Sequence, residues 1–322
     1  MRAIVVSELG GPDVMKIGER DDPHAKPGQL VVRIAAAGVN FMDIYQRSGI
    51  GAYKARTPYT PGAEGAGTVL EVGEGVTDFA VGDQVAWAGG PGSYAEQVAL
   101  PASNAVPVPP GFDLKFAAAV MLQGLTAHYL CTSTFPVQEG NITVVHAAAG
   151  GVGLLLTQMV KRRGGVVVAT VSTTAKALLA QRAGADHVTT YEEFTEAVRR
   201  VSGERGADVV FDGVGKTTFD DGLAALRPRG MMVLYGAASG PVPPLDPQRL
   251  NSAGSLFLTR PTMTHYVADR AELLWRAGDL FEWLAKSELD VRIGGEYPLA
   301  AASRAHEDLA ARRTTGKLLL IP

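Results

Sequence analysis

The sequence has one cysteine, Cys131, among its 322 residues. A single thiol excludes a disulfide within the chain and any zinc site built from several thiolates. Cys131 lies in an apolar segment, residues 126–132, whose composition predicts a helix. We therefore interpret it as a buried structural thiol and not as a reactive one.

The net charge is small, and long apolar runs are absent from the sequence. The formal charge is −3, and no stripe of lysine and arginine stands out, so nucleic acid and anionic membranes are not expected partners. No apolar run approaches the roughly 20 residues of a membrane-spanning helix, and the first residues lack the character of a targeting signal. With 46% hydrophobic residues, the chain is expected to be globular, cytoplasmic and long enough for two domains.

Glycine, in contrast, is abundant, and the stretch NITVVHAAAGGVGLLLTQMVKRRGGVVVATVS at 141–172 contains the most informative cluster. An apolar strand (142–145) leads through a glycine turn (148–153) into a helix (154–163) and a second apolar strand (166–171). This order predicts one βαβ unit.

The glycine turn of this unit has the composition of a phosphate-binding turn. Gly150 and Gly151 carry no Cβ and let the backbone approach a pyrophosphate, while Gly153 lets helix and strand pack closely. The helix start offers N–H groups and a partial positive charge to the anion. The turn therefore predicts a dinucleotide site. A turn with a purely structural role is the alternative.

The end of the second strand bears on the choice of dinucleotide. An NAD-preferring fold places Asp or Glu there, to bind the ribose hydroxyls. This chain has Ser172 and Thr173, with Lys176 one helical turn further on. Hydroxyls and an ammonium accept a 2′-phosphate that a carboxylate would repel, so we expect NADPH. Alternatively, the hydroxyls only cap the next helix and Lys176 is a solvated charge; both interpretations can hold together.

The two parts of the chain differ in rhythm. Up to about residue 120, short apolar runs are divided by glycine and proline, which predicts a twisted, mostly antiparallel β domain. From about residue 121, strands and helices alternate, which predicts a six-stranded, doubly wound parallel sheet. The expected strands of the second part start with the two above and continue at 186–190, 207–212, 231–236 and 255–259. A helical region at 266–287, a strand at 291–298, a helix at 300–313 and a strand at 317–321 follow.

Motifs along nearly the whole chain resemble the zinc-independent, ζ-crystallin-like quinone oxidoreductases of the medium-chain dehydrogenase/reductase superfamily. They are GVNFMD at 38–43, YQRSG at 45–49, GAEGAG at 62–67, QGLTA at 123–127, HAAAGGVG at 146–153, LTRP at 258–261 and LLIP at 319–322. The resemblance implies an α/β protein in which a GroES-like catalytic domain (1–120 and 288–322) surrounds a Rossmann dinucleotide-binding domain (121–287).

The resemblance also shows what is missing. Zinc alcohol dehydrogenases of this superfamily have a cysteine where this chain has Asn40, and a His-Glu pair where it has Ala63 and Glu64. Asparagine and alanine do not replace thiolate and imidazole, so no zinc is expected. Without a Lewis acid, an electron-poor acceptor is the suitable substrate. The resemblance therefore implies NADPH-dependent reduction of a quinone by hydride transfer or, alternatively, of an α,β-unsaturated aldehyde or ketone.

Site residues follow from the same resemblance. Asn40 is expected to hold the nicotinamide ribose or to polarise a carbonyl, and Tyr45 and Tyr53 to donate hydrogen bonds to the acceptor, or only to form the wall of its pocket. Glu64 is expected to hold structure. The expected cofactor-binding residues are Asn40, Phe41, Met42, Asp43, Ile44, Tyr129, Gly150, Gly151, Val152, Ser172, Thr173, Lys176, Tyr191, Val214, Gly236, Ala237, Ser239, Arg312 and Lys317.

Two further expectations concern partners. Ser255 to Thr259 has the composition of an edge strand that pairs with its twin, which predicts a homodimer. An NADPH-binding protein with a structural or RNA-binding role is the remaining alternative to an enzyme, although the acidic balance of the chain argues against RNA.

Overall fold

The computed structural model describes residues 1–50, 54–90 and 92–322. The chain divides into two compact units. The first unit comprises Met1–Gln123, Val267–Lys286 and Val291–Pro322, and the second comprises Gly124–Tyr266 and Ser287–Asp290.

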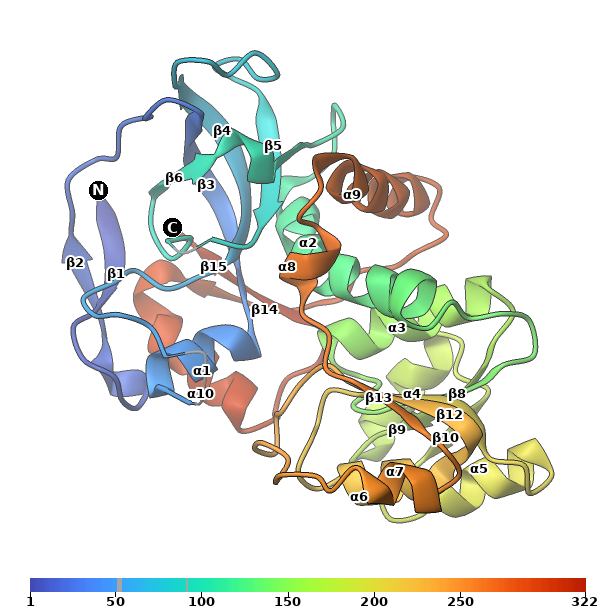
Figure 1. Cartoon of the computed structure of the whole chain (residues 1–322). Helices are drawn as coiled ribbons and strands as arrows, with labels where there is room; N and C mark the ends of the chain where they lie inside the picture. Colours follow the sequence, from blue (N-terminus) through green and yellow to red (C-terminus); the bar gives the residue numbers. More distant parts are fainter. Residues whose placement is uncertain (51–53, 91) are drawn as a thin grey trace. The chain divides into compact units, whose positions relative to one another are not determined.

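A largely antiparallel sheet forms the body of the first unit (Figure 1). Its strand order is β14-β15-β3-β4-β5-β7, and β6 also pairs with β3. The strands are β3 (Gln29–Val39), β4 (Glu64–Val72), β5 (Gln84–Ala88), β6 (Gln97–Pro101), β7 (Ala105–Pro107), β14 (Ile293–Pro298) and β15 (Lys317–Ile321). A separate antiparallel pair joins β1 (Arg2–Val6) to β2 (Met15–Glu19).

The pairing of β15 with β3 matters most for the site. The two strands are antiparallel, with Leu319 opposite Gly38. The last strand of the chain, red in Figure 1, therefore lies beside the blue strand β3, and both chain ends belong to the first unit. This register places Lys317 close to the end of β3, where helix α1 begins.

Short helices and one long helix complete the first unit. They are α1 (Phe41–Ser48), α9 (Arg270–Ala285), α10 (Ala302–Ala310) and the 3₁₀ turns η1 (Pro12–Val14), η3 (Ala102–Asn104) and η5 (Leu299–Ala301). Helix α2 (Leu114–Tyr129) contains the division between the units. The core of the first unit packs apolar side chains of the sheet, such as Leu30 and Trp87, against those of α10, such as Ala302 and Ala305.

A parallel sheet of six strands forms the second unit, in the order β10-β9-β8-β11-β12-β13. The strands are β8 (Ile142–Val145), β9 (Val166–Thr170), β10 (His187–Thr189), β11 (Ala207–Asp212), β12 (Leu226–Leu234) and β13 (Phe257–Thr259). The helices are η4 (Leu130–Thr134, a π-helix), α3 (Gly151–Arg162), α4 (Thr174–Arg182), α5 (Phe194–Ser202), α6 (Phe219–Ala225), α7 (Gln248–Ser252) and α8 (Met263–Tyr266).

The strand order reverses between β8 and β11, as in doubly wound sheets. Helices α3 and α4 pack against each other, and α5 and α6 form a second pair, so that helices cover both faces of the sheet (Figure 1). Strands β8 and β11 are buried along their whole length, which explains why they are predominantly apolar and do not alternate strictly between apolar and polar residues. The predicted fold class is confirmed.

The structure departs from the sequence expectation at its longest predicted helix. The helical region predicted for 266–287 corresponds to α9, which begins only at Arg270, because the side chain of Asp269 accepts a hydrogen bond from the N–H of Glu272 and caps the helix there; the preceding helix α8 ends at Tyr266. Residues 267–286, which the sequence analysis placed in the dinucleotide-binding domain, group with the first unit. Among the described residues, no helix is long and apolar enough to cross a membrane.

Candidate functional site

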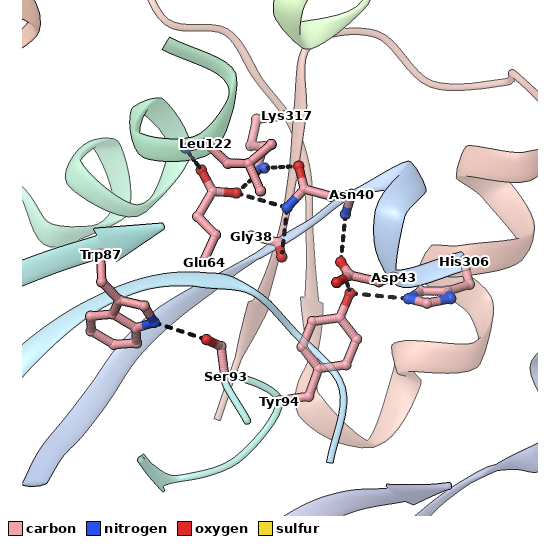
Figure 2. Close-up of polar contacts among 10 residues, drawn as sticks. All are labelled: Gly38, Asn40, Asp43, Glu64, Trp87, Ser93, Tyr94, Leu122, His306 and Lys317. Atoms are coloured by element: carbon pink, nitrogen blue, oxygen red, sulfur yellow. Dashed lines mark hydrogen bonds and ion pairs between the residues drawn. The ribbon is translucent and has the colours of Figure 1, made fainter. Parts of the chain in front are cut away.

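The first unit has a buried charged cluster where β3 passes into α1. Asn40, which caps α1, contacts Lys317 from β15 and Glu64 from β4 (Figure 2). Lys317 is 1% exposed and Glu64 is 0% exposed, and their side chains form an ion pair. Lys317 Nζ also donates to Asn40 Oδ1 at 2.8 Å, and Asn40 Nδ2 donates to Glu64 Oε2 at 2.9 Å. The cluster satisfies each of its charges within the protein.

Glu64 is held in this cluster from a further side. The backbone N–H of Leu122, in α2, donates to Glu64 Oε1 at 2.6 Å. A Cβ on Gly38 would overlap the Glu64 carboxylate and lie 2.5 Å from Lys317 Cε, so glycine at this position makes room for the ion pair. The expectation that Glu64 holds structure agrees with these contacts.

A zinc ion does not fit this set of side chains. Asn40 and Ala63 supply neither a thiolate nor an imidazole. Moreover, the oxygens of Asn40 and Glu64 that face inward are bound by the Lys317 ammonium, whose positive charge would repel a second cation. Over residues 1–50, 54–90 and 92–322, no group of three His, Cys, Asp or Glu side chains forms a candidate metal site.

A second buried network lies beside the first, at Asp43 of α1. The Asp43 carboxylate accepts hydrogen bonds from the Asn40 N–H at 2.9 Å and from the Tyr94 hydroxyl at 3.0 Å, both on Oδ2. Tyr94 also contacts His306 of α10 at 3.0 Å (Figure 2), and His306 Nδ1 lies 3.4 Å from Arg47 Nε. Asp43 Oδ1 is buried and has no hydrogen-bond partner among the described residues.

The direction of this chain of hydrogen bonds follows from its arginine. Arg47 has only donors, so its Nε–H donates to His306 Nδ1, and the neutral imidazole carries its proton on Nε2. That proton is donated to the Tyr94 oxygen, and the Tyr94 hydroxyl donates to Asp43. Because arginine does not release a proton, the chain is not a proton route, and we interpret it as a support for α1.

Burial shifts the pKa values of Asp43, His306 and Tyr94. It raises the pKa of the Asp43 carboxyl from 3.8 to about 7, because the anion is removed from water and one of its oxygens is unpaired. Burial, with the nearby Arg47 charge, lowers the pKa of His306 from 6.5 to about 3. It also raises the pKa of Tyr94 well above its ordinary value.

The structure places the other expected residues of the first unit as follows. Phe41, Met42 and Tyr45 are half-buried on α1, whereas Asp43 and Ile44 are buried. Tyr53 lies outside the described residues. Arg312 is exposed, beyond the end of α10.

Lys317 requires a correction. The resemblance implied a phosphate partner, but its ammonium is buried and is bound by Asn40 and Glu64. An ammonium so engaged is not available to a phosphate without breaking the buried ion pair.

In the second unit, the glycine turn lies between β8 and α3. Gly150 is the N-cap of α3, whose first N–H groups have no partner within the helix. A Cβ on Gly153 would overlap the carbonyl oxygen of Ala147 and lie 2.7 Å from Cα of Ala148. The helix start thus lies directly against the turn, as a pyrophosphate-binding turn requires.

The expected adenosine end of the site lies at the β9 to α4 junction. Thr173 caps α4 and its hydroxyl accepts from the backbone N–H of Lys176 at 3.3 Å, while Lys176 Nζ lies 3.4 Å from Ser172 Oγ. Ser172 and Thr173 are exposed. Thr173 therefore caps α4, as one interpretation of the sequence expected, and the same exposed residues are those expected to bind the 2′-phosphate. The ring of Tyr191 stacks at 5.9 Å on the buried His146.

The loops after β11 and β12 are joined by hydrogen bonds that the sequence did not predict. Asp212 Oδ1 accepts from the N–H groups of Val214 and Gly215 at 2.7 and 2.9 Å, and Ser239 Oγ donates to the Val214 carbonyl at 2.8 Å. Asp212 therefore fixes the loop that carries Val214, and Ser239 joins it to the loop that carries Gly236 and Ala237. An aspartate at the end of a predicted strand, followed by glycine, was the available signal.

Tyr129 and Tyr266 of the second unit stack, with ring centroids 4.2 Å apart and planes 7° from parallel. Tyr129 is buried. Cys131 is buried, as expected.

Comparison with known proteins first defines the class. Residues 26–110 match the family model described as alcohol dehydrogenase GroES-like domain, and residues 151–273 match the model described as zinc-binding dehydrogenase. These two matches, with the two folds described above, define a member of the medium-chain dehydrogenase/reductase superfamily.

Full-length relatives define the family. The chain is 42% identical to a quinone oxidoreductase of Pseudomonas aeruginosa, over 100% of this chain and 99% of that protein. It is 39% identical to a 2-haloacrylate reductase of a Burkholderia species, over 99% and 98%. The crystal structure of Escherichia coli quinone oxidoreductase complexed with NADPH superposes with a TM-score of 0.97 and 36% identity, covering 100% of both chains. The chain belongs to the zinc-independent quinone oxidoreductases of this superfamily.

Proposed function

We propose that this protein reduces quinones with NADPH, by hydride transfer and without zinc. The observation that carries the proposal is the ammonium of Lys317, which is bound to Asn40 and Glu64, while Asn40 and Ala63 stand where the resemblance places a cysteine and a histidine in zinc dehydrogenases of the superfamily. A dehydrogenase fold without a Lewis acid is suited to an acceptor that is already electron-poor. The full-length similarity to quinone oxidoreductases supports the same acceptor.

The second unit carries the residues proposed to bind the pyrophosphate and adenosine parts of NADPH. The first N–H groups of α3, at Gly151 and Val152, are proposed to bind the pyrophosphate, which the close packing at Gly153 permits. Ser172, Thr173 and Lys176 are proposed to bind the 2′-phosphate. The remaining contacts are proposed for Tyr129, Gly150, Tyr191, Val214, Gly236, Ala237 and Ser239.

The first unit carries the residues proposed to face the nicotinamide and the acceptor. When bound, NADPH supplies the hydride. Asn40, Phe41, Met42, Asp43 and Ile44 are proposed to contact the nicotinamide half, and Tyr45 and Tyr53 to contact the acceptor. Arg312, which is exposed, is proposed as a phosphate partner. Residues 1–120 and 288–322 are proposed as the catalytic domain, to which residues 267–286 are added because they group with it.

An acceptor screen tests the proposal. The native protein should oxidise NADPH faster with 1,4-benzoquinone than with 2-chloroacrylate or a simple alkenal, as measured by the loss of NADPH absorbance. A higher kcat/KM on 2-chloroacrylate would instead favour the alternative, reduction of an activated double bond, which the 2-haloacrylate relative supports. No turnover with either acceptor class, together with a salt-sensitive shift of RNA, would favour the binding protein.

Lys176→Glu should separate the two nicotinamide cofactors. The substitution places a carboxylate beside Ser172 and Thr173 at the start of α4, where it should repel a 2′-phosphate. We expect the KM for NADPH to rise about tenfold, with little change for NADH. Arg182→Glu, an exposed residue in the last turn of the same helix, is a control for charge reversal. Equal losses with both cofactors would contradict the 2′-phosphate assignment.

The protein is also proposed to be a cytoplasmic homodimer. Strand β13 lies at the edge of the parallel sheet, with Phe257 56% exposed and Leu258 36% exposed. Pairing of β13 with its copy across a two-fold axis would cover these side chains and the unpaired backbone groups. Light scattering should give twice the chain mass of 33.8 kDa. Phe257→Glu should shift the mass toward the monomer, and a native monomer at all concentrations would overturn the proposal.

A further inference from the structure

The buried cluster at Asn40 fixes which way the Asn40 amide faces. Lys317 has only donors on its ammonium, and the Glu64 carboxylate has only acceptors. The amide oxygen must therefore face Lys317 and the amide nitrogen must face Glu64, as Figure 2 shows. The reverse orientation would place an N–H against the ammonium and a carbonyl against the carboxylate.

The Asn40 amide has one hydrogen-bonding position left for a ligand. Nδ2 has two protons, and it contacts Glu64 Oε2 at 2.9 Å and the Gly38 carbonyl at 3.4 Å. Oδ1 accepts two hydrogen bonds, and among the described residues it receives one, from Lys317. Toward a ligand, Asn40 is therefore an acceptor and not a donor.

This chemistry selects the ligand group. A quinone has only acceptor oxygens, so the fixed amide does not polarise it. The ribose hydroxyls of a nicotinamide nucleotide are donors, and so is its carboxamide. Of the two roles expected for Asn40 from the sequence, holding the cofactor agrees with the fixed amide, and polarising a carbonyl does not.

We propose that Lys317 is a positioning residue: its ammonium, together with Glu64, holds the Asn40 amide with the oxygen directed toward a hydrogen-bond donor on the nicotinamide half of NADPH. The inference rests on the proposed function for the identity of the cofactor. Lys317 itself does not touch the cofactor. Its contribution is the orientation of Asn40, which would otherwise rotate between two arrangements.

Two variants test the proposal. Lys317→Met removes the ammonium at similar length but leaves the buried Glu64 unpaired, which is costly. The double variant Lys317→Met/Glu64→Gln removes both charges and keeps the fold testable if the single variant fails to fold. A glutamine at position 64 keeps its carbonyl oxygen on the Leu122 N–H, so its N–H groups face Asn40 and no longer favour the native orientation of the Asn40 amide. Lys317→Arg restores a donor-only group.

The readout is the dissociation constant of two ligands, measured by calorimetry. NADPH contains the nicotinamide half, and adenosine 2′,5′-bisphosphate lacks it. In the double variant we expect NADPH to bind about tenfold more weakly and adenosine 2′,5′-bisphosphate to bind as in the native protein. Lys317→Arg should recover part of the NADPH affinity.

Two results would overturn the proposal. Native NADPH affinity in the double variant would show that the amide orientation is irrelevant to the cofactor. Equal weakening of both ligands would show a general structural role for Lys317. The proposed function is tested by a different measurement. If it is wrong, the native protein will not turn over quinones, but the two dissociation constants will still test the role of Lys317.

Discussion

Gly153→Ala should destabilise the second unit and weaken NADPH binding, whereas Gly278→Ala should raise the thermal stability of the protein. Both glycines lie inside helices, α3 and α9, where alanine is favoured over glycine by about 1 kcal/mol. The two positions differ in their surroundings. A Cβ on Gly278 meets nothing within 4 Å, but a Cβ on Gly153 would overlap backbone atoms of Ala147 and Ala148.

Backbone atoms at Gly153 have little freedom to move away. They belong to the turn between β8 and α3, and a shift there displaces the helix start that is proposed to bind the pyrophosphate. Overpacking of this kind costs about 1–3 kcal/mol, and we expect at least a tenfold loss of NADPH affinity. Calorimetric unfolding and NADPH titration of both variants measure the two effects. Similar unfolding temperatures for the two variants would show that the turn tolerates a side chain.

The sequence predicted the second unit well because each of its elements is local. Strands β8 and β11 have the predicted bounds, since a parallel strand covered on both faces is predominantly apolar over its whole length. The same reasoning failed for α1. Only Asn40 separates this helix from the last residue of β3, Val39. The helix has eight residues, which is too short for apolar residues to repeat with a recognisable helical spacing.

The buried networks of the first unit were beyond prediction because their members are far apart in the sequence. Lys317 lies 253 residues from Glu64, and His306 lies 212 residues from Tyr94. Only the fold brings them together, through the pairing of β15 with β3. One signal was present: Lys317 begins the apolar strand Lys317–Ile321, where a lysine would be expected to reach solvent and is instead fully enclosed.

The buried network of Asp43, Tyr94 and His306 predicts two opposite dependences of stability on pH. Asp43 has a higher pKa in the folded protein, about 7, than its ordinary 3.8. As pH rises from about 4 to about 7, the unfolded chain loses this proton first, so Asp43 lowers stability with rising pH. His306 has a lower pKa in the folded protein, about 3, than its ordinary 6.5. As pH falls from about 6.5 to about 3, the unfolded chain gains a proton first, so His306 lowers stability with falling pH.

Each slope is on the order of 1.4 kcal/mol per pH unit, and the two oppose each other between about pH 4 and pH 6.5. In the native protein the two pH dependences largely cancel, and single variants should therefore show each of them separately. Asp43→Asn should lose stability on acidification below pH 6.5, because His306 then acts alone. His306→Gln, which keeps an acceptor for Arg47 and a donor for Tyr94, should gain stability from pH 7 to pH 4, because Asp43 then acts alone.

The double variant Asp43→Asn/His306→Gln supplies the reference, because it retains every other titrating group. Relative to this reference, the free energy of unfolding of each single variant should change by about 4 kcal/mol over three pH units, in opposite directions for the two variants. Urea unfolding followed by tryptophan fluorescence measures this, since Trp87, Trp275 and Trp283 all belong to the first unit. His24→Gln removes an imidazole that is 87% exposed and controls for the loss of a histidine. Parallel curves for the two single variants would mean that burial does not hold Asp43 protonated and His306 neutral, and that the network tolerates charge.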